Sequence, residues 1–198
     1  VCTSPVVNGI TIDADHVTLD LAGHALIGPG TQSGHGIYQP AHRHHLTVRN
    51  GVLAHWRGIE QGGIYAPGRN NQFSRLHVCS NAFGIYSGPA TAMDHCTAVA
   101  NTEDGLHARD ASSLTACAAW SNAYGIVAGT GSSLADCAAR LNSGYGITAE
   151  YGSALLNCSA SGNLQYDFRL LDHATASHCS ASENGLDGIY AGIGNVIS

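Results

Sequence analysis

The chain is short of charge and of long apolar segments. It has no lysine, its eight basic residues are all arginine against 14 acidic residues, and charged residues make up 11% of its 198 residues. Binding to a phosphate backbone needs clustered cations, so the lack of any basic block argues against nucleic acid as a partner. No apolar run approaches the roughly 20 residues of a membrane-spanning helix. A disordered chain is also excluded, because 44% of the residues are hydrophobic.

Glycine is abundant, at 25 residues, and much of it recurs at a fixed interval. An asparagine column steps by 20 or 21 residues, and a second column, of leucine and then cysteine, keeps the same step. The two columns are Asn81, Asn101, Asn122, Asn142, Asn163 and Asn184, and Leu76, Cys96, Cys117, Cys137, Cys158 and Cys179. Two independent columns with one period predict a solenoid, because a repeat that cannot bury its own apolar face must stack on its neighbours.

Within one period the pattern predicts three short strands and three corners. From Gly125 to Asn142, short runs of apolar and small residues are interrupted by Thr130-Gly-Ser132 and by Asp136. A mark of Gly followed by Ile or a similar residue opens each coil, at Gly9, Gly36, Gly63, Gly84, Gly105, Gly125, Gly146, Asp167 (the one substitution) and Gly188. Gly63 is preferred over Gly58 as the third mark, because Gly84 then follows after 21 residues. We therefore expect an all-β fold, a single parallel β-helix over residues 1–198 with about eight or nine coils of 20–27 residues.

Both columns are interpreted as scaffold. Asparagine at a corner can hydrogen bond to the coils above and below it, and a catalytic site would not repeat on six successive coils. The cysteine column is interpreted as buried free thiols that behave as small apolar side chains. Disulfides between neighbouring coils are the alternative, since parallel strands ~4.8 Å apart allow them. Cys2 and Cys79 lie outside the column, and the sequence leaves them either paired or free.

Three stretches carry a resemblance to a known family: residues 9–24 (GITIDADHVTLDLAGH), Gly28-Pro-Gly30 and Leu46-Thr-Val-Arg-Asn-Gly51. Together with the repeats that follow, they look like bacterial right-handed parallel β-helix repeat proteins, the pectate-lyase-like superfamily, over essentially the whole chain. The resemblance implies a right-handed solenoid that is exported to the periplasm or to the extracellular cell surface. It also implies a further coil before Cys2, and residues 194–198 stop partway into a coil. We therefore expect the domain to lack a native cap at one or both ends, so that copies could stack end to end.

Tyrosines gather at outward positions of the Gly-Ile strand. The positions two residues after or one residue before a mark hold Tyr38, Tyr65, Tyr86, Tyr124, Tyr145, Tyr166 and Tyr190. Rows of tyrosine beside small residues form a flat aromatic strip, on which sugar rings can dock through C–H contacts with the ring faces. The alternative is that tyrosine simply suits an exposed strand.

The most enzyme-like group is His107, Arg109, Glu150 and Arg169, which spans about three coils. A polysaccharide lyase or uronate C5-epimerase needs a cation for the carboxylate, a base for the C5 proton and an acid for the leaving group, and Arg, His and Tyr can fill these roles. The resemblance does not extend to catalytic motifs. The calcium-binding carboxylates of pectate lyases have no match, the lysine of some alginate lyases is missing, and the paired aspartates of pectin hydrolases are not evident. Catalysis is therefore the less favoured interpretation.

Five of the 12 histidines lie close together in the sequence, at His24, His35, His42, His44 and His45. His42 and His44 face the same way in an extended segment, and this spacing can hold copper or zinc. The alternative is that these histidines only donate hydrogen bonds at corners, in which case no cofactor is expected.

These observations favour an exported, rigid solenoid that acts as a carbohydrate-binding or structural surface module, with a polysaccharide or surface glycan as its partner. The first alternative is a polysaccharide lyase or uronate C5-epimerase that works in a groove along one face. The second is a self-assembling rod or filament subunit.

Overall fold

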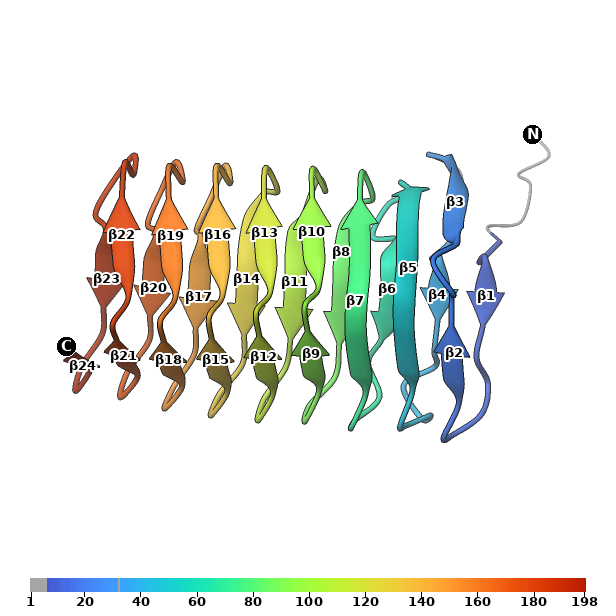
Figure 1. Ribbon diagram of the computed structural model, residues 1–198, viewed down its shortest axis with the longest axis horizontal. Coiled ribbons are helices and arrows are strands. Elements are labelled where there is room, and N and C mark those ends of the chain that lie inside the picture. Colours follow the sequence, from blue (N-terminus) through green and yellow to red (C-terminus); the bar gives the residue numbers. More distant parts are fainter. Residues whose placement is uncertain (1–6, 32) are drawn as a thin grey trace.

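The computed structural model describes residues 7–31 and 33–198, and these residues form a rod of stacked coils (Figure 1). The strands pair in parallel from each coil to the next. No helix within the described residues is long and apolar enough to cross a membrane. The predicted all-β parallel solenoid is confirmed.

The Gly-Ile marks lie in a nine-stranded sheet that forms one face of the rod. Its strands are β1 (Ile10–Thr11), β4 (Ile37–Tyr38), β6 (Gly62–Ala66), β8 (Phe83–Ser87), β11 (Asp104–Ala108), β14 (Tyr124–Ala128), β17 (Ile147–Ala149), β20 (Phe168–Leu170) and β23 (Ile189–Ala191). Ile64 pairs with Ile37 and Ile85, which confirms Gly63 as the third mark. The seven strands between β1 and β23 pair on both sides. The solenoid thus has about seven fully stacked turns, slightly fewer than the eight or nine coils predicted.

The other two faces of the rod belong to one 15-stranded sheet. One face holds β2 (Thr18–Asp20), β9 (Ala92–Asp94), β12 (Ser113–Thr115), β15 (Ser133–Ala135), β18 (Ala154–Leu156), β21 (Thr175–Ser177) and β24 (Val196–Ile197). The other holds β3 (Ala25–Gly30), β10 (Thr97–Val99), β13 (Ala118–Trp120), β16 (Ala138–Arg140), β19 (Ser159–Ser161) and β22 (Ser180–Ser182). Two long strands, β5 (Thr47–Trp56) and β7 (Gln72–Cys79), run across both faces and join them. In these two coils one long strand replaces the two short strands that the sequence predicted.

Each regular coil bends at three corners, and a residue with left-handed backbone lies at each bend. The three columns of these residues are Asn70, Ala90, Ala111, Gly131, Gly152, His173 and Gly194; Arg75, His95, Ala116, Asp136, Asn157 and His178; and Ser80, Ala100, Ser121, Leu141, Gly162 and Glu183. Their φ angles lie between 50° and 73°. One left-handed residue turns the chain sharply while the residues on either side keep extended geometry.

Stacked columns fill the interior. Cys96, Cys117, Cys137 and Cys158 are buried free thiols, while Cys79 and Cys179 are free and half-buried. The neighbouring Cys117 side chain and burial raise the pKa of the Cys137 thiol to about 12, so it stays protonated. Cys2 lies outside the described residues.

The asparagine column carries hydrogen bonds from coil to coil. The backbone N–H of Asn101 donates to Oδ1 of Asn122 over 3.0 Å, and the N–H of Asn122 donates to Oδ1 of Asn142 over 2.9 Å. Asn122 also donates from Nδ2 to the carbonyl oxygen of Ala98 at 3.1 Å. The side chains thus satisfy backbone groups that the corner removes from the strand pairing.

Candidate functional site

Two adjoining hollows form a groove on the outer side of the nine-stranded sheet. The larger has a volume of about 530 Å³ and is lined by His35, Glu60, Gln61, Tyr65, Phe83, Tyr86, Glu103, Asp104 and His107. The smaller, of about 290 Å³, is lined by Tyr86, His107, Arg109, Asp110, Gly129 and Glu150. Tyr86 and His107 line both hollows, so the groove continues from one coil to the next along the rod.

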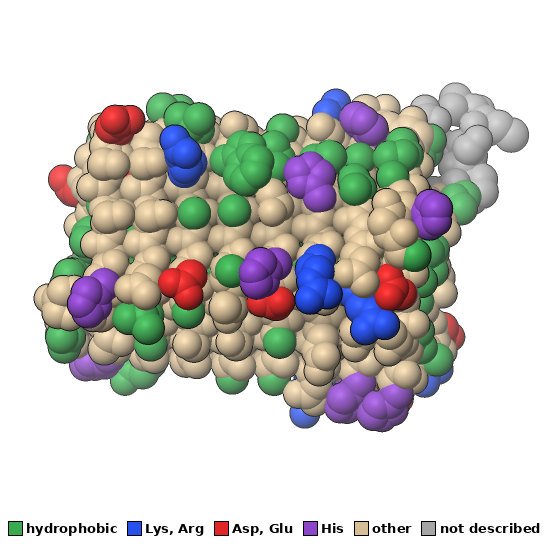
Figure 2. All heavy atoms as spheres, in the orientation of Figure 1, with side chains coloured by type: hydrophobic (Ala, Val, Ile, Leu, Met, Phe, Trp, Pro, Cys, Tyr) green, Lys and Arg blue, Asp and Glu red, His purple; other side chains and the backbone are tan. Residues whose placement is uncertain are grey.

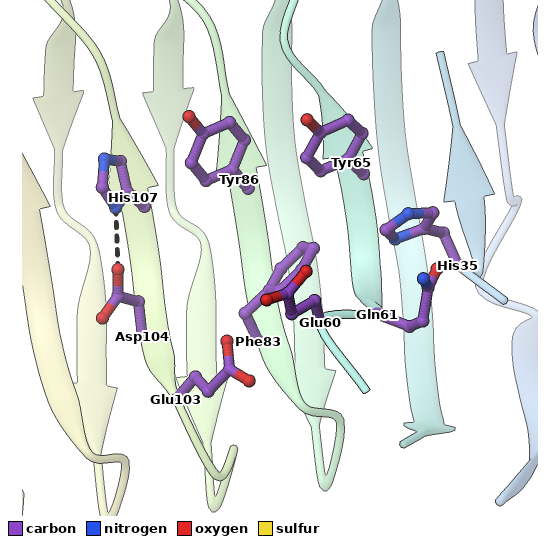
Figure 3. A pocket seen from close by; sticks show the side chains of 9 residues that line it. All are labelled: His35, Glu60, Gln61, Tyr65, Phe83, Tyr86, Glu103, Asp104 and His107. Atoms are coloured by element: carbon purple, nitrogen blue, oxygen red, sulfur yellow. Dashed lines mark hydrogen bonds and ion pairs between the residues drawn. The ribbon is translucent and has the colours of Figure 1, made fainter. Parts of the chain in front are cut away.

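A row of nearly parallel rings runs along one side of the groove. The ring centroids of Tyr65 and Tyr86 are 5.2 Å apart with an interplanar angle of 13°, and Tyr38 follows Tyr65 at 6.0 Å. His107 continues the row beyond Tyr86 at 4.8 Å, with its ring tilted by 39° to that of Tyr86. Figure 3 shows the rings of Tyr65 and Tyr86 side by side, with their hydroxyl groups pointing the same way. The register of β4, β6, β8 and β11 produces this row, because equivalent residues of adjacent coils lie opposite one another.

Carboxylates lie along the other side of the larger hollow. In Figure 3 the side chains of Glu60, Glu103 and Asp104 lie below the tyrosine rings. Burial, together with the charges of Asp104 and Glu60, raises the pKa of Glu103. The three carboxylates are therefore close enough to repel one another.

Histidines stand at the two ends of this hollow (Figure 3). Nδ1 of His107 lies 2.7 Å from Oδ2 of Asp104, so the carboxylate orients the ring and leaves Nε2 free of this contact. His35 is only 7% exposed, and its Nδ1 accepts a hydrogen bond of 3.2 Å from the N–H of Gly62. Burial lowers the pKa of His35 to about 4, so the ring is neutral at pH 7.

Three of the four residues predicted for catalysis meet at the smaller hollow. His107, Arg109 and Glu150 line it together, although no ion pair joins them among the described residues. Oε2 of Glu150 lies 3.5 Å from the hydroxyl of Thr130. Arg169 does not line this hollow. Its guanidinium lies over the ring of Tyr145 instead, 5.4 Å from the ring centroid. A catalytic role for these residues stays a prediction.

The predicted tyrosines divide into two rows. Tyr38, Tyr65 and Tyr86 belong to the row at the groove. Tyr124, Tyr145, Tyr166 and Tyr190 form a second row farther along the rod, with centroids 5.1–5.6 Å apart. The second row does not line either hollow. Binding of a saccharide to any of these tyrosines stays a prediction.

The histidines proposed as copper or zinc ligands lie at a corner near β2. Nε2 of His42 lies 3.4 Å from Oδ1 of Asp13, and Nδ1 of His44 accepts a hydrogen bond of 3.2 Å from the N–H of Arg69. Among residues 7–31 and 33–198, no group of three or more His, Cys, Asp or Glu side chains is arranged to hold a metal ion. A metal at His42 and His44 stays a prediction.

Comparison with known proteins identifies the family to which the fold belongs. The family described as right-handed β-helix region matches residues 35–184. The chain belongs to this family. The right-handed solenoid that the sequence resemblance implied is thereby confirmed. No curated protein matches the chain by sequence.

Solved structures similar to this family member have distant sequences. The A-module of a mannuronan C-5 epimerase from Azotobacter vinelandii superposes with a TM-score of 0.64 at 14% identity, covering 95% of this chain and 66% of that module. A periplasmic alginate epimerase gives a TM-score of 0.45 at 11% identity, over 92% of this chain and 66% of the other. The Dettilon tailspike protein gives 0.40 at 14% identity, over 95% and 40%. At these identities the likeness concerns the fold, and this β-helix spans 66% of the epimerase module's length.

Sequence reasoning missed the acidic side of the groove. Glu103 and Asp104 precede the mark at Gly105, where the neighbouring coils have Ala82-Phe83 and Ala123-Tyr124. The replacement of a small and an aromatic residue by two adjacent acidic residues was the sequence signal that could have indicated an acidic groove. Glu60 had no such signal, because it lies in the irregular segment before β6 rather than at a repeat position.

Proposed function

We propose that this β-helix binds a polysaccharide lengthwise in the groove formed by the two hollows. The observation that carries the proposal is the continuous row of Tyr65, Tyr86 and His107 beside hydrogen-bonding side chains in one groove. Aromatic rings contact the apolar faces of sugars, while carboxylates and ring N–H groups bind hydroxyl groups. An extracellular or periplasmic location, where surface glycans occur, is part of the same proposal.

The test compares the two tyrosine rows. Binding of the purified protein to a panel of neutral, anionic and cationic polysaccharides is measured by calorimetry, with Tyr86→Ala and Tyr124→Ala as matched variants. Tyr86→Ala should weaken binding about tenfold or more, because a central aromatic contact is removed. Tyr124 belongs to the row outside the groove, so Tyr124→Ala should have little effect. Loss of binding only in Tyr124→Ala would place the saccharide on the second row, and no binding to any polymer would refute the proposal.

A second candidate, a polyuronate lyase or C5-epimerase, is favoured by one observation. His107 is oriented by Asp104 at 2.7 Å, with Tyr86 beside it and Arg109 in the adjoining hollow. An oriented imidazole is a suitable base for the C5 proton, a phenol can return a proton, and a guanidinium can neutralise the uronate carboxylate.

This candidate is tested in heavy water with oligouronates. An epimerase would incorporate deuterium at C5, and a lyase would release unsaturated sugars that absorb ultraviolet light. His107→Gln should abolish either product, and Asp104→Asn should lower the rate strongly, because the imidazole loses its orienting partner. Polyuronates that emerge unchanged after prolonged incubation with the unmodified protein would exclude this candidate.

A further inference from the structure

Negative charge dominates the groove. Glu60, Glu103 and Asp104 line the larger hollow, and no arginine is among the residues that line it. The smaller hollow adds Asp110 and Glu150 against a single guanidinium, that of Arg109. The chain contains no lysine that could compensate these charges.

Most of the charge in the larger hollow is uncompensated. Asp104 pairs with His107, but the side chains of Glu60 and Glu103 have no ion pair or hydrogen bond within the described part of the chain. Burial and the two neighbouring carboxylates raise the pKa of Glu103, which reflects the cost of holding these charges together. A cation bound between them would relieve that repulsion, whereas an anion would increase it.

A second, independent feature points to a ligand in this hollow. Because Nδ1 of the buried His35 accepts the Gly62 N–H, the ring proton is on Nε2. Nε2 has no hydrogen-bond partner among the described residues, and His35 lines the hollow. The His35 ring also stacks on Tyr65, with centroids 4.8 Å apart, so this free N–H lies beside the aromatic row and can donate to an oxygen atom of a ligand.

We infer that the groove selects a polymer of positively charged amino sugars. The tyrosine row contacts the apolar face of the sugar, the ammonium group lies toward Glu60 and Glu103, and a hydroxyl or ring oxygen accepts from His35. The inference rests on the proposed saccharide-binding function and specifies the chemistry of its ligand.

The test uses three hexasaccharides with the same type of linkage but different charge: β-1,4-linked glucosamine, its N-acetylated form and β-1,4-linked mannuronate. Affinities are measured by calorimetry at about pH 6, above the ordinary carboxyl pKa. We expect the amino sugar to bind most tightly, the N-acetylated sugar more weakly and the uronate most weakly. Salt should reduce the difference, because the Debye length falls from about 10 Å at 0.1 M to about 3 Å at 1 M.

Matched variants separate the groove from the overall negative charge. Glu103→Gln should weaken amino-sugar binding about fivefold and leave N-acetylated sugar binding nearly unchanged. Glu183→Gln, which removes an exposed carboxylate four coils away, should change neither. Tyr86→Ala should weaken both ligands.

Three results would overturn the inference. Tighter or equal binding of the uronate, or equal binding of the amino and N-acetylated sugars, would show that the groove does not select positive charge while leaving saccharide binding intact. Amino-sugar binding that survives both Glu103→Gln and Tyr86→Ala would assign the attraction to the molecule's net charge of −6. If none of the three sugars and no polymer of the panel binds, the proposed function itself fails.

Discussion

Gln39 shows how far a single residue departs from the repeat. It is completely buried at the inward position that Ala66, Ala108 and Ala128 occupy in other coils, and its Oε1 and Nε2 have no hydrogen-bond partner in the described structure. A buried amide without partners costs about 1–3 kcal/mol.

Gln39→Met should therefore stabilise the fold. Methionine has a similar length and shape but no polar group to desolvate, so the free energy of unfolding should rise by about 1–2 kcal/mol. The measurement is denaturant unfolding, with Gln72→Met as the control because Gln72 is exposed on β7. A less stable Gln39→Met variant would show that a buried water or ligand satisfies the amide.

His35 gives the molecule a defined response to acid. Its folded pKa of about 4 lies below the ordinary value of 6.5, because burial disfavours the charged ring. Between these values the unfolded chain binds a proton that the folded chain does not, so stability falls as the pH drops from about 6.5 to about 4. The contribution of this one residue is at most about 3 kcal/mol.

The variant His35→Gln should flatten this part of the stability profile, because glutamine keeps an acceptor for Gly62 and does not titrate. Unfolding by denaturant is measured at several pH values from 4 to 7, with the exposed His55→Gln as control. A wild-type slope that persists in His35→Gln would assign the acid sensitivity to other groups.

The sequence allowed the residues of the site to be predicted only in part. Tyr86, His107 and Arg109 were found because they stand at fixed offsets from a repeating mark. The environment of His35, by contrast, depends on other coils, because its ring stacks on Tyr65 and lies beside Phe83, with centroids 4.8 Å and 5.7 Å away. Such contacts between coils have no local sequence signal.

At the scale of elements, the corners explain both the success and the error of the strand prediction. Asn50 and Arg75 are left-handed at equivalent corners, yet the residues around them pair from Thr47–Gln72 to Ala54–Cys79. Asn50-Gly51 is a common turn dipeptide, yet the pairing skips only one residue there. A turn signal in a solenoid therefore indicates a bend and does not by itself end a strand.

The substitution of Gly by Asp at residue 167 also has a structural explanation. The Asp167 side chain is fully buried, and its carboxylate accepts hydrogen bonds from Nδ2 of Asn163 at 2.6 Å and from the N–H of Ser182 at 2.8 Å. Its contact with Asn163 replaces the one that Oδ1 of the next asparagine makes with Nδ2 of Asn122 and of Asn142. This irregular coil, the most prominent variation in the sequence, is thus part of the interior scaffold.

The left-handed corners permit a test of opposite substitutions. Ala111 and Gly131 occupy the same column, with φ of 55° and 67°, and a side chain added at Gly131 would meet no neighbouring atom. Gly131→Ala should therefore destabilise the coil by about 1 kcal/mol from backbone strain alone, and Ala111→Gly should stabilise it by a few tenths.

The control for this pair lies in a strand. Ala154→Gly in β18 should destabilise, because glycine has no advantage in an extended conformation and loses more entropy on folding. Thermal unfolding of the three variants gives the comparison. Equal effects of Ala111→Gly and Ala154→Gly would contradict the role of the left-handed bend.

At the scale of the whole molecule, the faces of the rod differ in character. The view in Figure 2 shows a surface of mostly backbone and uncharged side chains, with scattered charges. The groove residues instead concentrate five carboxylates and a row of aromatic rings over β4 to β17 on the nine-stranded sheet. The periodicity made the sheet predictable in full, but a period describes what the coils share. The groove arises where neighbouring coils differ, so its depth and charge could not be read from the repeat.

Because the groove crosses several coils, affinity should depend on the length of the saccharide. A short oligomer can occupy only the larger hollow, whereas a longer one also reaches the smaller hollow, some 5–10 Å farther along at ~4.8 Å per coil. Binding should therefore tighten with chain length and then level off once both hollows are filled, since further sugars find no lining residues.

Glu150→Gln changes only the smaller hollow and Glu103→Gln only the larger. Calorimetry on an oligomer series should thus show that Glu150→Gln weakens the affinity for long oligomers alone, while Glu103→Gln weakens the affinity for short and long ones. If Glu150→Gln weakened the shortest oligomer that binds, that ligand would occupy the smaller hollow, which would contradict this order of filling.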